Sequence, residues 1–328
     1  MELILIALML FGGALGIASK NVSFGGIVEQ EATISEGIKI ERSSSEIFQS
    51  FAKARPPIDL FRLEDINENE ELIFTPLPAK KTDADPPEIS AQSVIIMDME
   101  TDYVILEKNS HDQLPIASIS KIVTALVAEK SLSPKHEIII SQQAINTEGG
   151  TGKLNVNEKF FTKELIDLML ISSSNDAAMQ IALEVSDGAE SFSELMNQKV
   201  ESFGLSDSNF VEPSGLDAKN ISTAFDIAQI ADSTFGESNI WNILGQSGMD
   251  TESVDGKIRH LKNTNQIIND PRIISGKTGF TNEAGGTLVV VAELGEENRK
   301  MIFVILGSGD RFGEMVVLLD WVEGNFEL

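Results

Sequence analysis

Cysteine is absent from the 328-residue sequence, and histidine, tryptophan and tyrosine occur only three, two and one times. Without cysteine the chain has no disulfide framework, no thiolate nucleophile and no cysteine-based zinc site. The three histidines, His111, His136 and His260, lie far apart and lack the spacing of metal ligands. We therefore expect neither a metal site nor a cofactor.

Basic residues are also scarce, because 25 Lys and Arg stand against 51 Asp and Glu and give a formal net charge of -26. A surface of this charge repels phosphate backbones, so we expect no nucleic-acid partner. The hydrophobic share of 42% is large enough to bury a core in a chain of this length. Wholesale disorder is therefore excluded.

The only long apolar run is LILIALMLFGGALGIA at residues 3–18, which contains no charged residue. As a helix it would rise about 24 Å, which is shorter than the roughly 30 Å hydrocarbon core of a bilayer. A signal peptide with a cleavage site near Ala18, a short membrane anchor and a buried core helix all remain open. Glu2 and the lack of Lys or Arg before the run are atypical of a signal peptide. We expect residues 1–19 to direct export, leaving the protein anchored on the extracytoplasmic face of the membrane, or secreted or periplasmic.

Residues 20–90 differ in character from the rest of the chain. They combine acidic clusters with Pro56-Pro57 and Pro86-Pro87, and they show no sustained helical or strand period. This composition predicts a disordered tether. A single folded domain is then expected over residues 91–328.

Regular periodicity begins near residue 91. Alternating apolar residues at 93–99 and 103–108 predict a β-hairpin. Helical spacing follows at residues 118–130, 163–171, 176–185, 189–203 and 223–233. Apolar strands are predicted at 272–280, 286–294 and 300–308, and a closing helix at 312–322. This order predicts an α/β fold in which helices sandwich a mainly antiparallel sheet, with a helical insert between the strands.

Ser118 and Lys121 open the first predicted helix, and residues three apart on a helix have neighbouring side chains. A lysine can activate a serine only when it is neutral, whereas its usual pKa is about 10.4. The apolar neighbours Ile119 and Ile122 predict a buried environment, which lowers the pKa of a lysine. The helix N-terminus also favours negative charge on Ser118.

Taken alone, each motif has an ordinary structural explanation. A second S-x-x-K match lies in the tether at residues 50–53, so a helix-capping serine with a solvated lysine is a frequent arrangement. Ser173 and Asn175 could cap the helix that follows them, and Lys277 could be an exposed strand lysine. The order and placement of the motifs favour a joint catalytic role instead. Ser173-Ser174-Asn175 lies between two predicted helices, and Lys277-Thr278-Gly279 lies in a predicted strand before a glycine turn.

In this combination the sequence resembles the low-molecular-weight penicillin-binding proteins, the D-alanyl-D-alanine carboxypeptidases, which share a β-lactamase-like fold and carry S-x-x-K, Ser-x-Asn and K-T-G elements. The resemblance covers nearly everything from residue 93 onward, and is closest at residues 114–128, 168–182, 210–231, 263–268 and 275–289. Two departures stand out. Ser174 replaces the usual glycine and is expected to narrow the cleft. The C-terminal β-rich domain and amphipathic anchor of some relatives are missing, so membrane attachment is expected only from residues 3–18.

The resemblance implies a serine-type DD-carboxypeptidase that removes the terminal D-Ala from peptidoglycan stem peptides and is inhibited by β-lactams. It implies that Ser118 is the acylated nucleophile and Lys121 its base. Ser173 would relay a proton between Lys121, Lys277 and the leaving amine. The oxyanion hole would consist of the backbone N–H groups of Ser118 and Phe280.

Substrate binding is implied for four further positions. Asn175 would hold an amide of the substrate, and Lys277 with Thr278 would bind the carboxylate of the terminal D-Ala. Gly279 would let the substrate backbone lie against the strand.

Other functions on the same fold remain as alternatives. A DD-endopeptidase acting on cross-links would use the same residues. A β-lactamase is disfavoured because residues 129–133 match the E-x-x-L-N loop only as E-x-x-L-S. An inactive peptidoglycan-binding scaffold is disfavoured because every motif residue is present. The sequence leaves open which peptide bond is preferred, whether residues 1–19 are removed, what the tether does and the oligomeric state.

Overall fold

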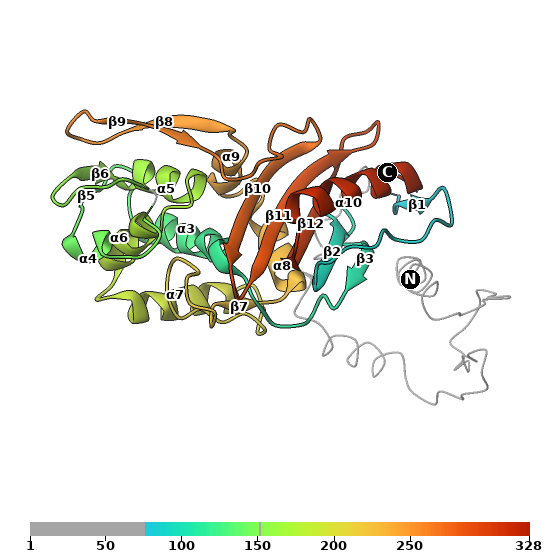
Figure 1. Ribbon diagram of the computed structural model, residues 1–328, viewed down its shortest axis with the longest axis horizontal. Helices are drawn as coiled ribbons and strands as arrows, with labels where there is room; N and C mark the ends of the chain where they lie inside the picture. The colour runs from blue at the N-terminus through green and yellow to red at the C-terminus, as the bar shows by residue number, and fades with distance from the viewer. Residues whose placement is uncertain (1–75, 151) are drawn as a thin grey trace, which may run out of the picture. The chain divides into compact units, whose positions relative to one another are not determined.

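The computed structural model describes residues 76–150 and 152–328, which fall within one compact unit, Ile73–Leu328 (Figure 1). The expected signal or anchor at residues 1–19, and residues 20–75 of the expected tether, lie outside the described residues. Within the described part of the chain, no helix combines the length and apolarity needed to cross a membrane.

A five-stranded antiparallel sheet forms one half of this unit, with the strand order β10-β11-β12-β2-β3 (Figure 1). Its strands are β2 (Ser93–Asp98), β3 (Val104–Lys108), β10 (Ile273–Thr281), β11 (Gly285–Leu294) and β12 (Arg299–Ser308). The predicted hairpin and the three predicted later strands are confirmed. Strand β10 lies at one edge of this sheet. One of its sides pairs with β11, and its other side pairs with no described strand.

The middle parts of strands β11 and β12 are continuously apolar because both faces of the sheet are covered. Successive side chains of a strand point to opposite faces. Val289 and Val304 pack with the helical half of the domain, whereas Val290 and Phe303 pack with Leu318 of the last helix, α10 (Arg311–Asn325). The run of buried residues in β11 and β12 therefore confirms the sandwich of helices around a sheet.

The helical half is built around α3 (Ser120–Ser131), which is buried from Ser120 to Ala128. Around or beside it lie α5 (Thr162–Ile171), α6 (Asn175–Val185), α7 (Ala189–Glu201), α8 (Ala224–Thr234) and α9 (Ile240–Leu244). These helices come between β3 and β10 in the chain, which confirms the predicted helical insert. Because α3 is buried from Ser120 to Ala128, the polar side chains of this part must find partners inside the domain.

Short elements that the sequence pattern does not reveal complete the helical half. They are β4 (Leu114–Pro115) with β7 (Ile221–Ser222), α4 (Gln142–Ile145), β5 (Glu137–Ile139) with β6 (Lys159–Phe161), and β8 (Gly248–Glu252) with β9 (Ile258–Lys262). Each has only two to five residues, which is too few for a periodic signal to stand out.

The last residues of the expected tether lie against the domain. Strand β1 (Ala79–Lys80) pairs with β13 (Phe326–Glu327) at the C-terminus. The Glu314 carboxylate of α10 accepts hydrogen bonds from the backbone N–H groups of Ser90 and Ala91. Both ends of the segment 79–91 are therefore hydrogen-bonded to the C-terminal elements of the same unit.

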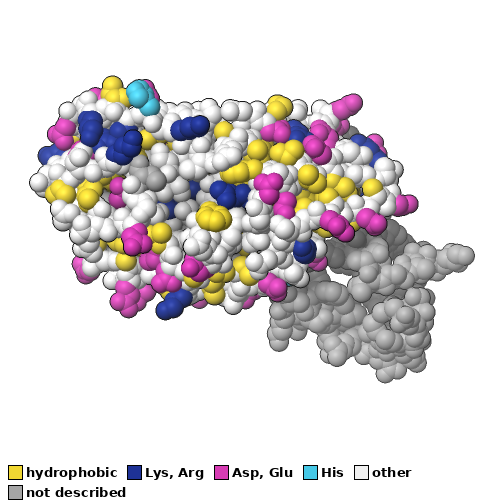
Figure 2. Space-filling model, viewed as in Figure 1, with side chains coloured by type: hydrophobic (Ala, Val, Ile, Leu, Met, Phe, Trp, Pro, Cys, Tyr) yellow, Lys and Arg dark blue, Asp and Glu magenta, His cyan; other side chains and the backbone are white. Residues whose placement is uncertain are grey.

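Acidic side chains occur at many separate places on the visible face of the described unit and form no single patch there (Figure 2). Among the described residues, no group of three or more His, Asp and Glu side chains is arranged to hold a metal ion. The acidic side chains of the visible face therefore mark no single site on it.

Candidate active site

Ser118 lies in a short 3-10 helix, η1 (Ala117–Ile119), which leads directly into α3. Lys121 is in the first turn of α3, and its Nζ lies 2.9 Å from Ser118 Oγ. The structure therefore brings the hydroxyl and the amine together, as the three-residue spacing predicts. Ser118 is half-buried, whereas the Lys121 side chain is fully buried.

Three oxygen atoms surround the Lys121 amine. Besides contacting Ser118, Nζ donates to Asn175 Oδ1 at 2.7 Å and to the Ser214 carbonyl oxygen at 2.6 Å. Burial lowers the pKa of Lys121 to about 7, although the negative charges of Glu212 and Asp176 oppose this shift. Near neutral pH a substantial fraction of Lys121 is therefore uncharged and able to accept a proton.

The Ser-x-Asn element lies at the junction between α5 and α6. Ser174 caps α6, because its Oγ accepts a hydrogen bond from Ala177 N at 3.2 Å, and the Ser174 side chain is fully buried. The expectation that Ser174 narrows the cleft is therefore wrong, since its side chain faces the protein interior. The sequence left helix capping open as a role for Ser173 and Asn175, but the cap of α6 is Ser174, which lies between them.

Asn175 and Ser173 have different partners. The Asn175 amide accepts from Lys121 and donates to the Glu148 carbonyl oxygen at 2.9 Å. Ser173 has a left-handed backbone with φ of 56° and remains half-buried. Its Oγ accepts a hydrogen bond from Lys277 Nζ at 3.0 Å. The side-chain amide of Asn175 thus orients Lys121, while Ser173 connects to the K-T-G strand.

Lys277, Thr278 and Gly279 lie in the edge strand β10. The Lys277 amine is buried and also donates to the Thr278 carbonyl oxygen at 2.9 Å. Burial lowers the pKa of Lys277 well below its usual value, and the positive charges of Lys121 and Arg311 lower it further. The Thr278 hydroxyl lies 2.7 Å from the hydroxyl of Thr264. Because Lys121 and Lys277 are both buried and their charges interact, the protonation states of the two lysines depend on each other.

Gly279 is required because the edge strand passes directly beside the nucleophile turn. A Cβ atom at this position would lie 2.8 Å from the Ser118 backbone nitrogen and would also overlap the Thr287 hydroxyl. The backbone amide of Ser118 therefore lies beside strand β10, next to Phe280. The predicted pair of oxyanion-hole residues, Ser118 and Phe280, thus belongs to adjoining segments of the structure.

The sequence profile of the D-alanyl-D-alanine carboxypeptidase family matches residues 80–310. This chain belongs to that family. It is therefore a serine-type D-alanyl-D-alanine peptidase, which confirms the class of enzyme expected from the motifs.

Individual members of the D-alanyl-D-alanine carboxypeptidase family are similar along most of the chain. A D-alanyl-D-alanine endopeptidase of Escherichia coli K12 is 33% identical over 258 residues, covering 75% of this chain and 81% of the relative. The D-alanyl-D-alanine carboxypeptidase DacF of Bacillus subtilis is 29% identical over 248 residues, covering 72% and 63%. Relatives of both specificities thus align with this enzyme.

Solved structures of similar proteins share its fold. The D-alanyl-D-alanine carboxypeptidase of Mycobacterium tuberculosis H37Rv has a TM-score of 0.67 and 24% identity, covering 74% of this chain and 94% of that one. The Streptomyces K15 DD-transpeptidase also has a TM-score of 0.67, with 23% identity and coverage of 74% and 100%. The predicted DD-peptidase/β-lactamase-like fold is confirmed.

Arg311 is a cation of this peptidase site that the motifs do not reveal. Its guanidinium carbon lies 5.6 Å from the centre of the Phe280 ring, and its charge helps to lower the pKa of Lys277. Its Nε atom has no hydrogen-bond partner among the described residues. Sheet register gives the signal that could have found it, because Phe280 pairs with Gly286 and Gly286 pairs with Ser308, three residues before Arg311.

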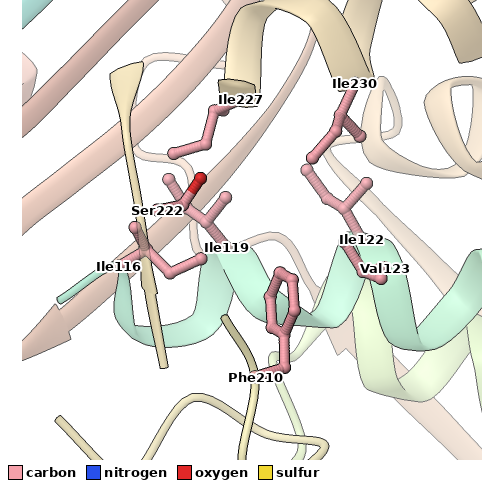
Figure 3. A pocket seen from close by; sticks show the side chains of 8 residues that line it. All are labelled: Ile116, Ile119, Ile122, Val123, Phe210, Ser222, Ile227 and Ile230. Carbon is pink, nitrogen blue, oxygen red and sulfur yellow. The ribbon is translucent and has the colours of Figure 1, made fainter. Parts of the chain in front are cut away.

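An apolar pocket lies beside η1 and α3 (Figure 3). Seven of its eight lining side chains are apolar, and they include Ile116 and Ile119 from the segment that carries Ser118. The eighth residue, Ser222, already makes a hydrogen bond of 2.7 Å with Ser208. Binding sites combine apolar walls with converging polar groups. This pocket lacks such groups, whereas Ser118 with Lys121 and Ser173 with Lys277 bring polar groups together.

Proposed function

We propose that the enzyme hydrolyses the peptide bond between the last two D-Ala residues of a peptidoglycan stem peptide, through an acyl-enzyme on Ser118. The observation that carries this proposal is the contact between Ser118 Oγ and the fully buried Lys121 amine, whose pKa is about 7. A serine beside a lysine of this kind can be activated without histidine.

The first half-reaction forms the acyl-enzyme. Ser118 Oγ attacks the carbonyl carbon of the penultimate D-Ala, and its proton passes to Lys121 Nζ. The backbone N–H groups of Ser118 and Phe280 bind the oxyanion that develops. When the peptide C–N bond breaks, the proton held by Lys121 passes to the leaving amine through Ser173 Oγ, which hydrogen-bonds to Lys277, and Lys121 is neutral again. The terminal D-Ala then leaves.

The second half-reaction returns the free enzyme. A water molecule attacks the ester carbonyl and transfers a proton to Lys121, and the bond to Ser118 Oγ breaks as the serine is protonated again. A β-lactam would acylate Ser118 by the same first step, with opening of its ring in place of the loss of D-Ala. The edge strand β10 has one side that no described strand occupies, so the substrate backbone can align along it.

Endopeptidase action on cross-linked stems is the second candidate function, because the 33% identical Escherichia coli relative is named an endopeptidase. Both reactions proceed through the same acyl-enzyme and differ in the leaving group. Mass spectrometry of the products from defined uncross-linked and cross-linked muropeptides separates them. Release of D-Ala alone supports the carboxypeptidase, and release of intact monomers from dimers supports the endopeptidase.

The location of the enzyme follows from its substrate. We propose that residues 3–18 direct it out of the cytoplasm and either anchor it to the membrane or are removed. Residues 20–75 would then tether the domain at a distance from the membrane. The support is the uncharged apolar run followed by an acidic, proline-containing segment.

We assign the carboxylate of the terminal D-Ala to Thr278 and Arg311. The Lys277 amine already donates to Ser173 Oγ and to the Thr278 carbonyl oxygen. Arg311 lies beside the exposed Phe280 ring. A guanidinium suits a carboxylate because it can donate two parallel hydrogen bonds. Lys277 then acts mainly through Ser173.

Arg311→Gln is expected to lower kcat/KM for the free-acid substrate by about 10- to 150-fold, the equivalent of roughly 1.5 to 3 kcal/mol for a charge-assisted hydrogen bond. The same variant should have little effect on a substrate with an amidated terminal D-Ala, because that contact is already lost. Steady-state kinetics on both substrates measures this. Lys277→Ala is expected to lower kcat/KM for both substrates. Arg272→Gln removes a cation paired with Asp270 and Asp320, and it should leave kcat/KM unchanged for both. Equal losses on acid and amide for Arg311→Gln would show that the carboxylate is bound elsewhere.

A further inference from the structure

The loop at residues 212–220 folds around the carboxylate of Glu212. This carboxylate accepts hydrogen bonds from Ser214 N at 2.7 Å, from Ser214 Oγ at 2.6 Å and from Gly215 N. Asn220 Nδ2 donates to it from the end of the loop at 3.1 Å. A single acidic side chain therefore determines the conformation of a segment that contains no regular secondary structure.

The same loop contacts both members of the Ser118–Lys121 pair. The Ser214 carbonyl oxygen accepts the 2.6 Å hydrogen bond from Lys121 Nζ. Gly215 has φ of 84°, and a Cβ atom there would overlap the carbonyl group of Ala117, the residue before Ser118. The loop conformation that Glu212 imposes thus places the Ser214 carbonyl oxygen against Lys121 Nζ. It also places the Gly215 backbone against the turn that precedes Ser118.

Further contacts fix the loop to the nucleophile helix. Thr124 Oγ1 donates to the Pro213 carbonyl oxygen at 2.6 Å. Asn220 Nδ2 lies 3.2 Å from Ser120 Oγ, and the Asn220 carbonyl oxygen accepts from Ile116 N at 3.1 Å. Hydrogen bonds therefore join the loop, which folds around the Glu212 carboxylate, to the first two turns of the helix.

We propose that Glu212 is a positioning residue for acylation: it folds the 212–220 loop so that the Ser214 carbonyl directs the Lys121 amine toward Ser118. This inference rests on the proposed function, in which Lys121 is the base. Glu212 does not reach the reacting atoms itself; it acts through Ser214.

The charge of Glu212 gives this role an observable consequence. The charged groups that face Lys121 are Glu212 from the loop, Asp176 from α6 and Lys277 from β10. Glu212 contributes more than Asp176 to raising the pKa of Lys121 against the effect of burial. Removing its charge should lower the pKa of Lys121. Because the neutral amine is the base, the acylation rate would then rise at lower pH than in the wild type.

The test is the pH dependence of the second-order rate constant for acylation by a fluorescent penicillin, measured on the full-length chain. For the wild type, the rate is expected to rise through a midpoint near the Lys121 pKa of about 7. In Glu212→Gln the midpoint should move down by about 0.5 to 1.5 pH units. The plateau should fall about 10- to 100-fold, because the base is misplaced.

Asp217→Asn is the matched control, since Asp217 is an exposed carboxylate in the same loop whose Oδ1 accepts only from the Lys219 backbone among the described residues. It should leave both midpoint and plateau unchanged. A Glu212→Gln midpoint equal to that of this control would overturn the proposal, even with a reduced plateau, because a purely structural role would then suffice.

Glu212→Asp keeps the charge and shortens the side chain, so it gives a second test if Glu212→Gln does not fold. Its midpoint should stay near that of the wild type while its plateau falls. A plateau equal to the wild type would contradict the positioning role. A wild-type rate that does not change with pH would instead contradict Lys121 as the base, and with it the proposed function.

Discussion

Replacing Ser118 with alanine is expected to abolish covalent labelling by a fluorescent penicillin. Ser118 Oγ lies 2.9 Å from a buried amine with a pKa of about 7, and its backbone nitrogen lies beside the edge strand at Gly279. The alanine variant removes only the nucleophile and leaves the base and the strand in place. In-gel fluorescence of the intact protein at equal concentration measures the loss.

Ser173→Ala provides the control for this experiment, because Ser173 is the other hydroxyl of the site that accepts a hydrogen bond from a buried lysine. This variant should still be labelled, although more slowly, since it removes a proton relay and keeps the nucleophile. The opposite pattern, with labelling kept in Ser118→Ala and lost in Ser173→Ala, would assign the acyl group to Ser173.

Replacing Lys121 with alanine is expected to lower the acylation rate constant by about 10²- to 10⁴-fold, the usual contribution of a general base. The remaining rate would come from the oxyanion hole and from substrate binding. Stopped-flow or quenched labelling kinetics measures the change. A loss of tenfold or less would indicate that another group removes the proton.

The stability of this variant must be measured alongside its kinetics. Without the amine, Asn175 Oδ1 and the Ser214 carbonyl oxygen lose a buried donor, at a cost of about 1 to 3 kcal/mol for each unsatisfied group. Lys121→Met leaves the same two acceptors unpaired but fills most of the volume. Thermal unfolding measures the stability of both variants. If they lose the same acylation rate but differ in stability, the lost rate comes from the missing base and not from a destabilised helix.

The elements that could be predicted from sequence are those whose signals are local. Strands buried on both faces appear as continuous apolar runs, and α3 appears as a helix without a polar face. The contact of Ser118 with Lys121 spans less than one helical turn, so spacing alone predicts it. The family resemblance then brought the distant motifs together correctly, since Lys277 does reach Ser173.

The parts that sequence did not reveal depend on tertiary contacts. The Ser214 carbonyl on Lys121 is a backbone atom, which no side-chain pattern can mark. Arg311 joins the site only through the register of three strands. Ser174 faces the protein interior because it caps α6. A comparison of motifs does not show whether a small side chain points into the interior or toward the substrate.

The central claim is that the acyl group forms on Ser118, and peptide mapping of the penicillin-treated enzyme tests it most directly. Trypsin should release residues 109–121 as one peptide, which contains Ser110, Ser118 and Ser120. Tandem mass spectrometry is expected to show one penicillin adduct on this peptide, with the added mass on Ser118. An adduct on another serine, or an unmodified peptide from fully labelled protein, would contradict the account.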